Sequence, residues 1–250
     1  MNWFLRAPSL WVATLFLIAL APAHGALFGR GDSGAKGEYL IVSGGPSLSK
    51  WEDLREDPHD RWWGNFVRAA RFRMTQLIRE NTEVGITWLV YRPAYVSRGS
   101  EDGVSRIDNI RSVPEMFARD FKHPIRLIWF DRSEELISYI NQRRGGKKII
   151  GFEYFGHSNR HAFMFDYSNQ ISGVSCSWLH ERDLRKIRRR VFGRRAYCKS
   201  WGCYSGLSFC PVFRKSTGIS MWGATHKTDF SELKYDRLPK VDEKGKWVYP

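Results

Sequence analysis

The sequence predicts an α/β domain built around a mostly parallel sheet. Short apolar runs that are typical of strands alternate with stretches that have helical periodicity, which favours a sheet covered by helices. Several of the runs are apolar almost throughout, as expected for strands buried on both faces. The chain has 250 residues, of which 42% are hydrophobic, so it is long enough to bury a sizeable core.

The first expected strand is Glu38–Ser43, which ends at the turn residues Gly44-Gly45-Pro46. A helix follows, because Phe66, Ala70, Met74, Leu77 and Ile78 have the spacing of one helical face. Asp60 is expected to cap this helix.

The middle of the chain adds two strands and a second helix. Ile86–Tyr91 and Ile125–Phe130 are predicted strands, and the polar, Gly-containing stretch Ser97–Arg111 between them is predicted to be a loop. Ser133, followed by two glutamates that suit the positive end of a helix dipole, begins a helix that ends at Gly145-Gly146.

Two further apolar runs lead directly into reactive side chains. The strand Lys148–Phe155 precedes Gly156-His157-Ser158-Asn159, and the strand Ala196–Trp201 precedes Gly202–Gly206, which contains Cys203. Between them the pattern predicts a short hairpin strand at Phe163–Tyr167 and a helix at Leu179–Val191. A last strand is expected at Ile219–Ala224.

His157 and Cys203 therefore each lie two residues beyond a predicted strand. If the two strands are parallel neighbours joined by the 179–191 helix, both side chains leave the same edge of the sheet, where functional groups gather in α/β folds. An imidazole beside a thiol favours the nucleophilic thiolate and can later protonate a leaving amine. The backbone N–H groups of Cys203 and Ser158 are candidate donors to the oxyanion. An inert buried cysteine, or half of a disulfide, is the structural alternative for Cys203.

Five segments of the chain together resemble a known protein family. In chain order, they are residues 39–45, 51–70, 149–157, 184–206 and 218–230. Their order and spacing resemble the caspase-like cysteine peptidases of clan CD and are most similar to the legumain branch. The resemblance implies a caspase-like three-layer sandwich and a cysteine endopeptidase that cleaves proteins or peptides through a thioester acyl-enzyme. It also implies that His157 is the general base, that Cys203 is the nucleophile, and that no metal or organic cofactor is needed.

The chain departs from that family at two points. Ser158 replaces the glycine that usually follows the histidine, and Trp201-Gly202 replace the usual acidic and small residues before the cysteine. An inactive peptide-binding scaffold of the same fold is therefore one alternative function. The last loop of the resemblance contains Asp229, which is expected to line a substrate pocket and favour a basic residue beside the cut; its other interpretation is a solvated carboxylate.

The N-terminus has the layout of a secretory signal peptide. Leu10–Ala21 is an apolar run that is shorter than the roughly 20 residues a transmembrane helix needs. Ala23 and Gly25 then precede a candidate cleavage site. We therefore expect a signal peptide at 1–25, a flexible lead at 26–37, the peptidase domain at 38–233 and a polar tail at 234–250. The mature protein is expected to be secreted or periplasmic without a stable membrane anchor; an uncleaved anchor is the alternative.

The formal charge of +14 raises the question of an anionic partner. Eight basic residues fall within 182–195, and we interpret them as the solvated face of the predicted helix. No nucleic-acid partner is expected on that interpretation. A basic secreted nucleic-acid-binding protein or nuclease is the second alternative function, and it predicts salt-sensitive binding to DNA or RNA.

The remaining candidates are a metal site and a disulfide. His157 and His161 are four residues apart, but their neighbours do not favour a helix and a third ligand is not evident, so no metal is expected. With Cys203 a free thiol, at most one disulfide forms among Cys176, Cys198 and Cys210.

Overall fold

A computed structural model of the chain describes residues 37–54, 56, 60, 62–81, 83–142, 144–167 and 177–250. Residues 35–250 form one compact unit. The expected signal peptide, nearly all of the expected flexible lead, and Cys176 lie outside the described residues. No helix within the described part of the chain is long and apolar enough to cross a membrane.

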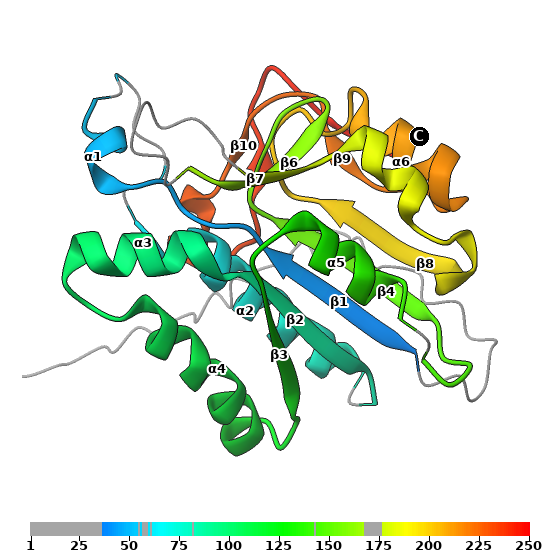
Figure 1. The fold of residues 1–250 in the computed structure, drawn as a ribbon, viewed down its shortest axis with the longest axis horizontal. Coiled ribbons are helices and arrows are strands. Elements are labelled where there is room, and N and C mark those ends of the chain that lie inside the picture. Colours follow the sequence, from blue (N-terminus) through cyan, green and yellow to red (C-terminus); the bar gives the residue numbers. More distant parts are fainter. Residues whose placement is uncertain are drawn as a thin grey trace, which may run out of the picture. The chain divides into compact units, whose positions relative to one another are not determined.

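The predicted α/β class and its parallel sheet are confirmed. The five parallel strands are β1 (Glu38–Ser43), β2 (Gly85–Tyr91), β3 (Ile125–Phe130), β4 (Ile149–Phe155) and β8 (Phe192–Ser200). Their order is β3-β2-β1-β4-β8 (Figure 1). The chain order reverses between β1 and β4, which is the position where open α/β sheets form their functional crevice. β4 and β8 are parallel neighbours, as the site prediction requires.

Helices cover both faces of this sheet, which gives three layers. α5 (Ser133–Ile140) and α6 (Phe209–Thr217) pack on one face, and α2 (Asn65–Glu80) and α4 (Arg106–Asp120) on the other. Figure 1 shows α5 in front of the strands and α2 behind them. Because side chains alternate along a strand, β1 contributes Leu40 and Val42 to the first core and Tyr39 and Ile41 to the second.

The prediction of a loop at 97–111 is wrong. This stretch is divided between α3 (Arg92–Asp102) and α4. α3 has Pro93 in its first turn and ends at Gly103, whose φ of 67° lies in the left-handed region that favours glycine. The Ser105 hydroxyl then caps α4 by accepting a hydrogen bond from the Asp108 N–H. The polar composition of 97–111 suggested a loop, although the sequence contains the residues that end α3, Gly103, and begin α4, Ser105.

The prediction of a helix at 179–191 is also wrong. The chain forms the strand β7 (Ser177–His180) and two 3-10 helices, η1 (Glu181–Lys186) and η2 (Arg189–Val191). The His180 side chain accepts a hydrogen bond from the Arg182 N–H and begins η1. Leu184 and Ile187 are both buried, and their spacing of three matches a 3-10 turn as well as a helical face.

The regions around the site are built from short elements. β5 (His157–Ser158), β6 (Ala162–Asp166) and β7 form an antiparallel sheet, which includes the expected hairpin strand, and α1 (Ser49–Glu52) follows β1. The strand expected at 219–224 forms only as β9 (Gly223–Ala224). Within the stretch expected as a polar tail, β11 (Lys240–Val241) pairs with β10 (Thr228–Asp229), and β12 (Trp247–Val248) pairs with β9. The remaining short helix is η3 (Ser231–Tyr235).

Candidate functional site

His157 begins β5 directly after the carboxyl end of β4. The buried Tyr154 hydroxyl donates a hydrogen bond to the His157 carbonyl at 2.7 Å, which fixes the backbone of the turn. The imidazole packs edge-on against the rings of Phe66 and Tyr167, with centroid distances of 4.9 Å and 4.7 Å. The ring is therefore held on two sides by aromatic groups.

Asp60 orients the His157 ring. The Nε2 atom of His157 lies 2.9 Å from Oδ2 of Asp60, whose side chain is only 1% exposed. The same Oδ2 accepts a hydrogen bond from the Ser47 N–H at 2.7 Å. Because a carboxylate only accepts, the hydrogen of this contact lies on Nε2 of His157.

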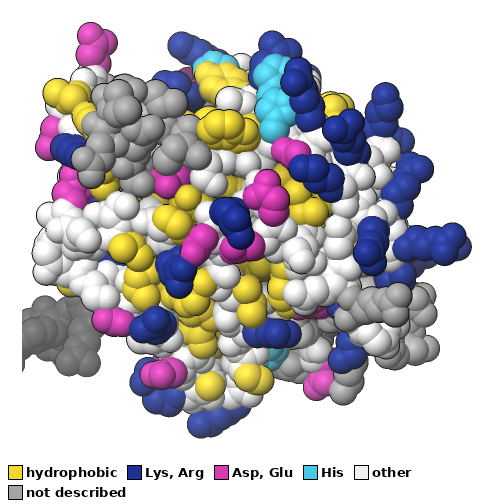
Figure 2. Space-filling model, viewed as in Figure 1, with side chains coloured by type: hydrophobic (Ala, Val, Ile, Leu, Met, Phe, Trp, Pro, Cys, Tyr) yellow, Lys and Arg dark blue, Asp and Glu magenta, His cyan; other side chains and the backbone are white. Residues whose placement is uncertain are grey.

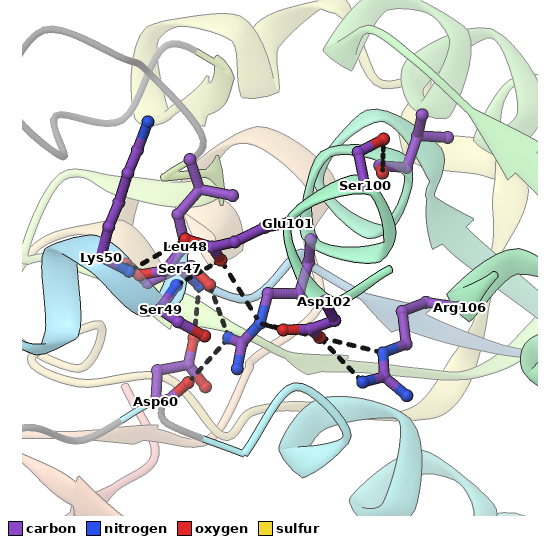
Figure 3. Close-up of polar contacts among 11 residues, drawn as sticks. Ser47, Leu48, Ser49, Lys50, Asp60, Ser100, Glu101, Asp102 and Arg106 are labelled. Atoms are coloured by element: carbon purple, nitrogen blue, oxygen red, sulfur yellow. Dashed lines mark hydrogen bonds and ion pairs between the residues drawn. The ribbon is translucent and has the colours of Figure 1, made fainter. Parts of the chain in front are cut away.

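The expectation that Asp60 caps α2 is wrong, because Gly64 occupies the N-cap position. Figure 3 shows Asp60 inside a polar cluster that joins the segment after β1 to α3. Arg98 is 4% exposed and donates from Nη1 to the carbonyls of Ser47 and Asp60 at 2.9 Å and 3.3 Å. Its Nε pairs with Asp102 at 3.1 Å, and Glu52 accepts from the Asp60 N–H at 2.9 Å. The carboxylate that holds the imidazole is thus itself held in place.

Cys203 follows β8 in a turn and is partly exposed. The Thr228 N–H donates to its sulfur at 3.3 Å, and the Thr228 hydroxyl lies 3.5 Å from the same atom. Donors aimed at a sulfur stabilise negative charge that develops there. Among the described residues, the ring of His157 and the sulfur of Cys203 hydrogen-bond to different partners, and no hydrogen bond joins them directly.

The turns that carry the two residues are in contact. The Ser158 hydroxyl donates to the Cys203 carbonyl at 2.6 Å. Gly202 is required at this contact, because a Cβ there would lie 2.2 Å from the Ser158 Oγ and 2.9 Å from the Gly156 carbonyl oxygen. Ser158 is buried, and its hydroxyl links the two turns. The sheet therefore delivers His157 and Cys203 to one edge, as predicted.

The Cys203 turn is braced on both sides. Before it, Trp201 Nε1 donates to the buried Glu153 at 2.6 Å, which anchors the end of β8 to β4. After it, Tyr204 has a φ of 57°, a left-handed conformation that costs energy for a bulky residue. The Tyr204 N–H donates to the His226 carbonyl at 3.0 Å, and His226 Nδ1 in turn lies 2.6 Å from Asp242.

The other predicted site residues have local partners. The Asp229 carboxylate accepts from the Ser231 N–H at 2.8 Å and from the Ser231 hydroxyl at 2.9 Å, although its neighbour Thr228 contacts the sulfur. His161 Nδ1 lies 3.1 Å from Glu181. No group of three or more His, Cys, Asp or Glu side chains placed to hold a metal occurs among the residues that the structure describes.

Cys203 is expected to be the cysteine that reacts among the three described ones. All three are free thiols, but Cys198 and Cys210 are buried, and burial raises the pKa of Cys198 well above its usual range and that of Cys210 to about 12. Iodoacetamide treatment of the native protein followed by peptide mass spectrometry should find the label on Cys203 and not on Cys198 or Cys210. In urea, all three should be labelled; native labelling of Cys198 at the rate of Cys203 would contradict the burial described here.

Comparisons of this chain with protein-family models, with curated proteins and with solved structures each found no match. The interpretation of the site therefore depends on its own geometry. That geometry consists of a partly exposed thiol, an oriented imidazole and a buried carboxylate at the carboxyl edge of a parallel sheet.

Proposed function

We propose that this chain is a cysteine hydrolase that cleaves peptide bonds, with Cys203 as nucleophile and His157 as general base. The observation that carries the proposal is the arrangement of the two turns. The half-exposed Cys203 lies on a turn that is hydrogen-bonded to the turn of His157, and the His157 ring is held by the buried Asp60. A nucleophile, a base and a group that orients the base are the parts that thiol-based acyl transfer needs.

In the proposed reaction, Nδ1 of His157 takes the thiol proton as the sulfur attacks the carbonyl carbon of the substrate. The backbone N–H groups of Cys203 and Ser158 are the proposed donors to the oxyanion. The imidazolium then gives its proton to the departing amine, which leaves a thioester on Cys203. Water activated by His157 attacks the thioester and releases the free acid and the thiol.

Before it attacks, the Cys203 sulfur must leave its hydrogen-bond contact with Thr228 and form one with the His157 ring. Catalytic hydrogen bonds are often long or misaligned in free enzymes and tighten when substrate binds, so the resting contact with Thr228 is compatible with the proposal. Thr228 lies next to Asp229, which belongs to the proposed substrate-binding loop. The chemistry requires no metal or organic cofactor, and the apolar run at Leu10–Ala21 favours a protein exported to the periplasm or outside the cell.

A peptide-binding scaffold that does not hydrolyse is the second candidate. It is favoured by Ser158, whose side chain bonds the Cys203 carbonyl where a glycine would leave open space. This candidate uses the same edge of the sheet for binding but does not need a reactive thiol.

The rate of thiol alkylation separates the two candidates. At neutral pH, iodoacetamide should label Cys203 at least about tenfold faster in the native protein than in His157→Ala, because the imidazole no longer assists the sulfur. His161→Ala is the matched control, since His161 contacts Glu181 and should leave the rate unchanged. Equally slow labelling of the wild type and His157→Ala would overturn the hydrolase and support the scaffold.

A further inference from the structure

Many exposed cations gather at the β8 edge of the sheet, on η1, η2 and the residues between them, the first half of β8, the end of α6 and the two residues before β4. We call this surface the basic face; its members are Lys147, Lys148, Arg182, Arg185, Lys186, Arg188, Arg189, Arg190, Arg194, Arg195, Arg214 and Lys215. Figure 2 shows Lys and Arg side chains crowded along the side where β8 and α6 lie in Figure 1. The solvated-helix interpretation of this run does not hold, because no α-helix forms there.

Contacts join these segments into one surface. Arg189 Nη2 donates to the Lys215 carbonyl at 3.4 Å, which connects η2 to α6. The Lys148 ammonium donates to the Arg190 carbonyl, which connects η2 to the start of β4. The cations therefore face solvent from neighbouring elements of one surface.

The basic face lacks the carboxylates that balance arginines elsewhere in the chain. Arg106 pairs with Asp102 at 2.8 Å and Arg119 with Asp120 at 2.7 Å, among other pairs outside the face. Within the face, Asp183 pairs with Lys186 at 2.7 Å. In the part of the chain that the structure describes, none of the other cations of the face lies within ion-pair distance of a carboxylate. Unbalanced charge of this density is attractive to a polyanion.

An aromatic group lies at one end of the basic face. Trp178 is 48% exposed, and it shares the outer side of β7 with His180, whereas Leu179 between them is buried. The His180 ring lies nearly parallel to that of His161, with a centroid distance of 6.3 Å. Arg182, the first cation of the face, has its N–H bonded to His180. The exposed Trp178 thus lies four residues before the first cation of the face, in the strand that leads into η1.

We propose that the basic face binds single-stranded nucleic acid, with phosphates on its arginines and a base stacked on Trp178. A planar guanidinium group can donate two hydrogen bonds to the oxygens of one phosphate, and an exposed aromatic ring offers a surface on which an unpaired base stacks. Sulfated glycans and anionic lipids satisfy the charge but have no purine or pyrimidine ring to stack. Cys203 lies three residues beyond the end of β8, whereas Arg194 and Arg195 lie in the first half of that strand, so the proposed phosphate contacts are separate from the proposed nucleophile. Trp178 lies two strands from His157 in the small sheet, because Met164 pairs with both residues.

Fluorescence anisotropy with labelled 20-nucleotide dT and rU strands tests the proposal on the full chain. Binding should weaken as salt rises, with a logarithmic slope of about −2 or steeper, which corresponds to three or more phosphate contacts. Arg188→Glu/Arg190→Glu/Arg194→Glu should lose at least about tenfold in affinity for both strands. The control, Arg79→Glu/Arg126→Glu/Lys234→Glu, reverses three exposed cations elsewhere and should lose less than about threefold.

Trp178→Ala separates nucleic acid from other polyanions. It should weaken binding of the single strands about tenfold and leave binding to heparin unchanged, because heparin has no bases. Equal losses in the two triple variants, an unchanged affinity in Trp178→Ala, or tighter binding to heparin or to phosphatidylserine vesicles than to the strands would each overturn the proposal. Alkylation of Cys203 should be unaffected in the two triple variants, so a failure of nucleic-acid binding leaves the proposed hydrolase standing.

Discussion

Glu153→Ala should lower the free energy of unfolding by about 3–5 kcal/mol, because it leaves the buried guanidinium of Arg73 without its carboxylate partner. Glu153 is fully buried on β4 and accepts from Arg73 Nε at 2.6 Å, from Trp201 Nε1 at 2.6 Å and from the Tyr39 hydroxyl. Arg73 is itself buried, and burial alone would lower the pKa of its guanidinium, but the charges of Glu153 and Tyr39 and their hydrogen bonds together raise that pKa. Urea unfolding followed by tryptophan fluorescence measures the loss.

Glu80→Ala is the control for this prediction. Glu80 lies 3.6 Å from Arg73 Nη1 but is half-exposed, so its removal should cost less than about 1 kcal/mol. The double variant Arg73→Met/Glu153→Met removes both charges and should recover much of the stability that Glu153→Ala loses. A cost for Glu153→Ala no larger than that for Glu80→Ala would show that the buried cluster is unimportant to the fold.

The same variant should also affect the site through Trp201. Because Trp201 directly precedes Gly202 and Cys203, its bond to Glu153 fixes where the Cys203 turn begins. The fold and the site are connected here by one side chain, because Glu153 contacts both Arg73 in the core and Trp201 at the start of the turn.

The strands could be predicted from their apolar runs, because β1, β2 and β4 are buried on both faces and the edge strand β3 exposes only Arg126. Ile86–Tyr91 and Ile125–Phe130 were found in this way, within one residue of β2 and β3. The helices were harder, since α3 and α4 are largely polar and their signals, Gly103 and Ser105, were taken for loop residues. At 179–191, a spacing of three between buried residues does not distinguish a 3-10 turn from an α-helix.

His157 and Cys203 could be predicted because each directly follows a strand, so chain order alone places them at one edge of the sheet. Asp60 could not be predicted as the partner of His157, because it lies 97 residues from His157 in the sequence and follows no strand. Its local pattern favoured a helix cap, and only the folded chain brings its carboxylate to the imidazole. Thr228, which contacts the sulfur, was missed for the same reason.

Asp60→Asn should slow alkylation of Cys203, and any peptidase activity, about tenfold and by no more than His157→Ala does. The amide still offers an oxygen to the Ser47 N–H and to Nε2 of His157, so the ring can keep its position. What the variant removes is the negative charge that stabilises the imidazolium as the thiol proton arrives at Nδ1. In the proposed reaction Asp60 is a positioning residue, because it acts on the sulfur only through His157.

Asp102→Asn is the matched control, since it changes a carboxylate of the same cluster that bonds Arg98 and Arg106 but not the imidazole. It should lower stability without changing the alkylation rate. Stability is measured by urea unfolding for both variants, so that a loss of rate is compared at equal folded fraction. Equal rates in the wild type and Asp60→Asn would mean that the carboxylate only stabilises the chain. A slow Asp60→Asn beside a normal Asp102→Asn would assign the effect to the carboxylate that contacts the ring, because the two variants perturb the same network and differ in that contact.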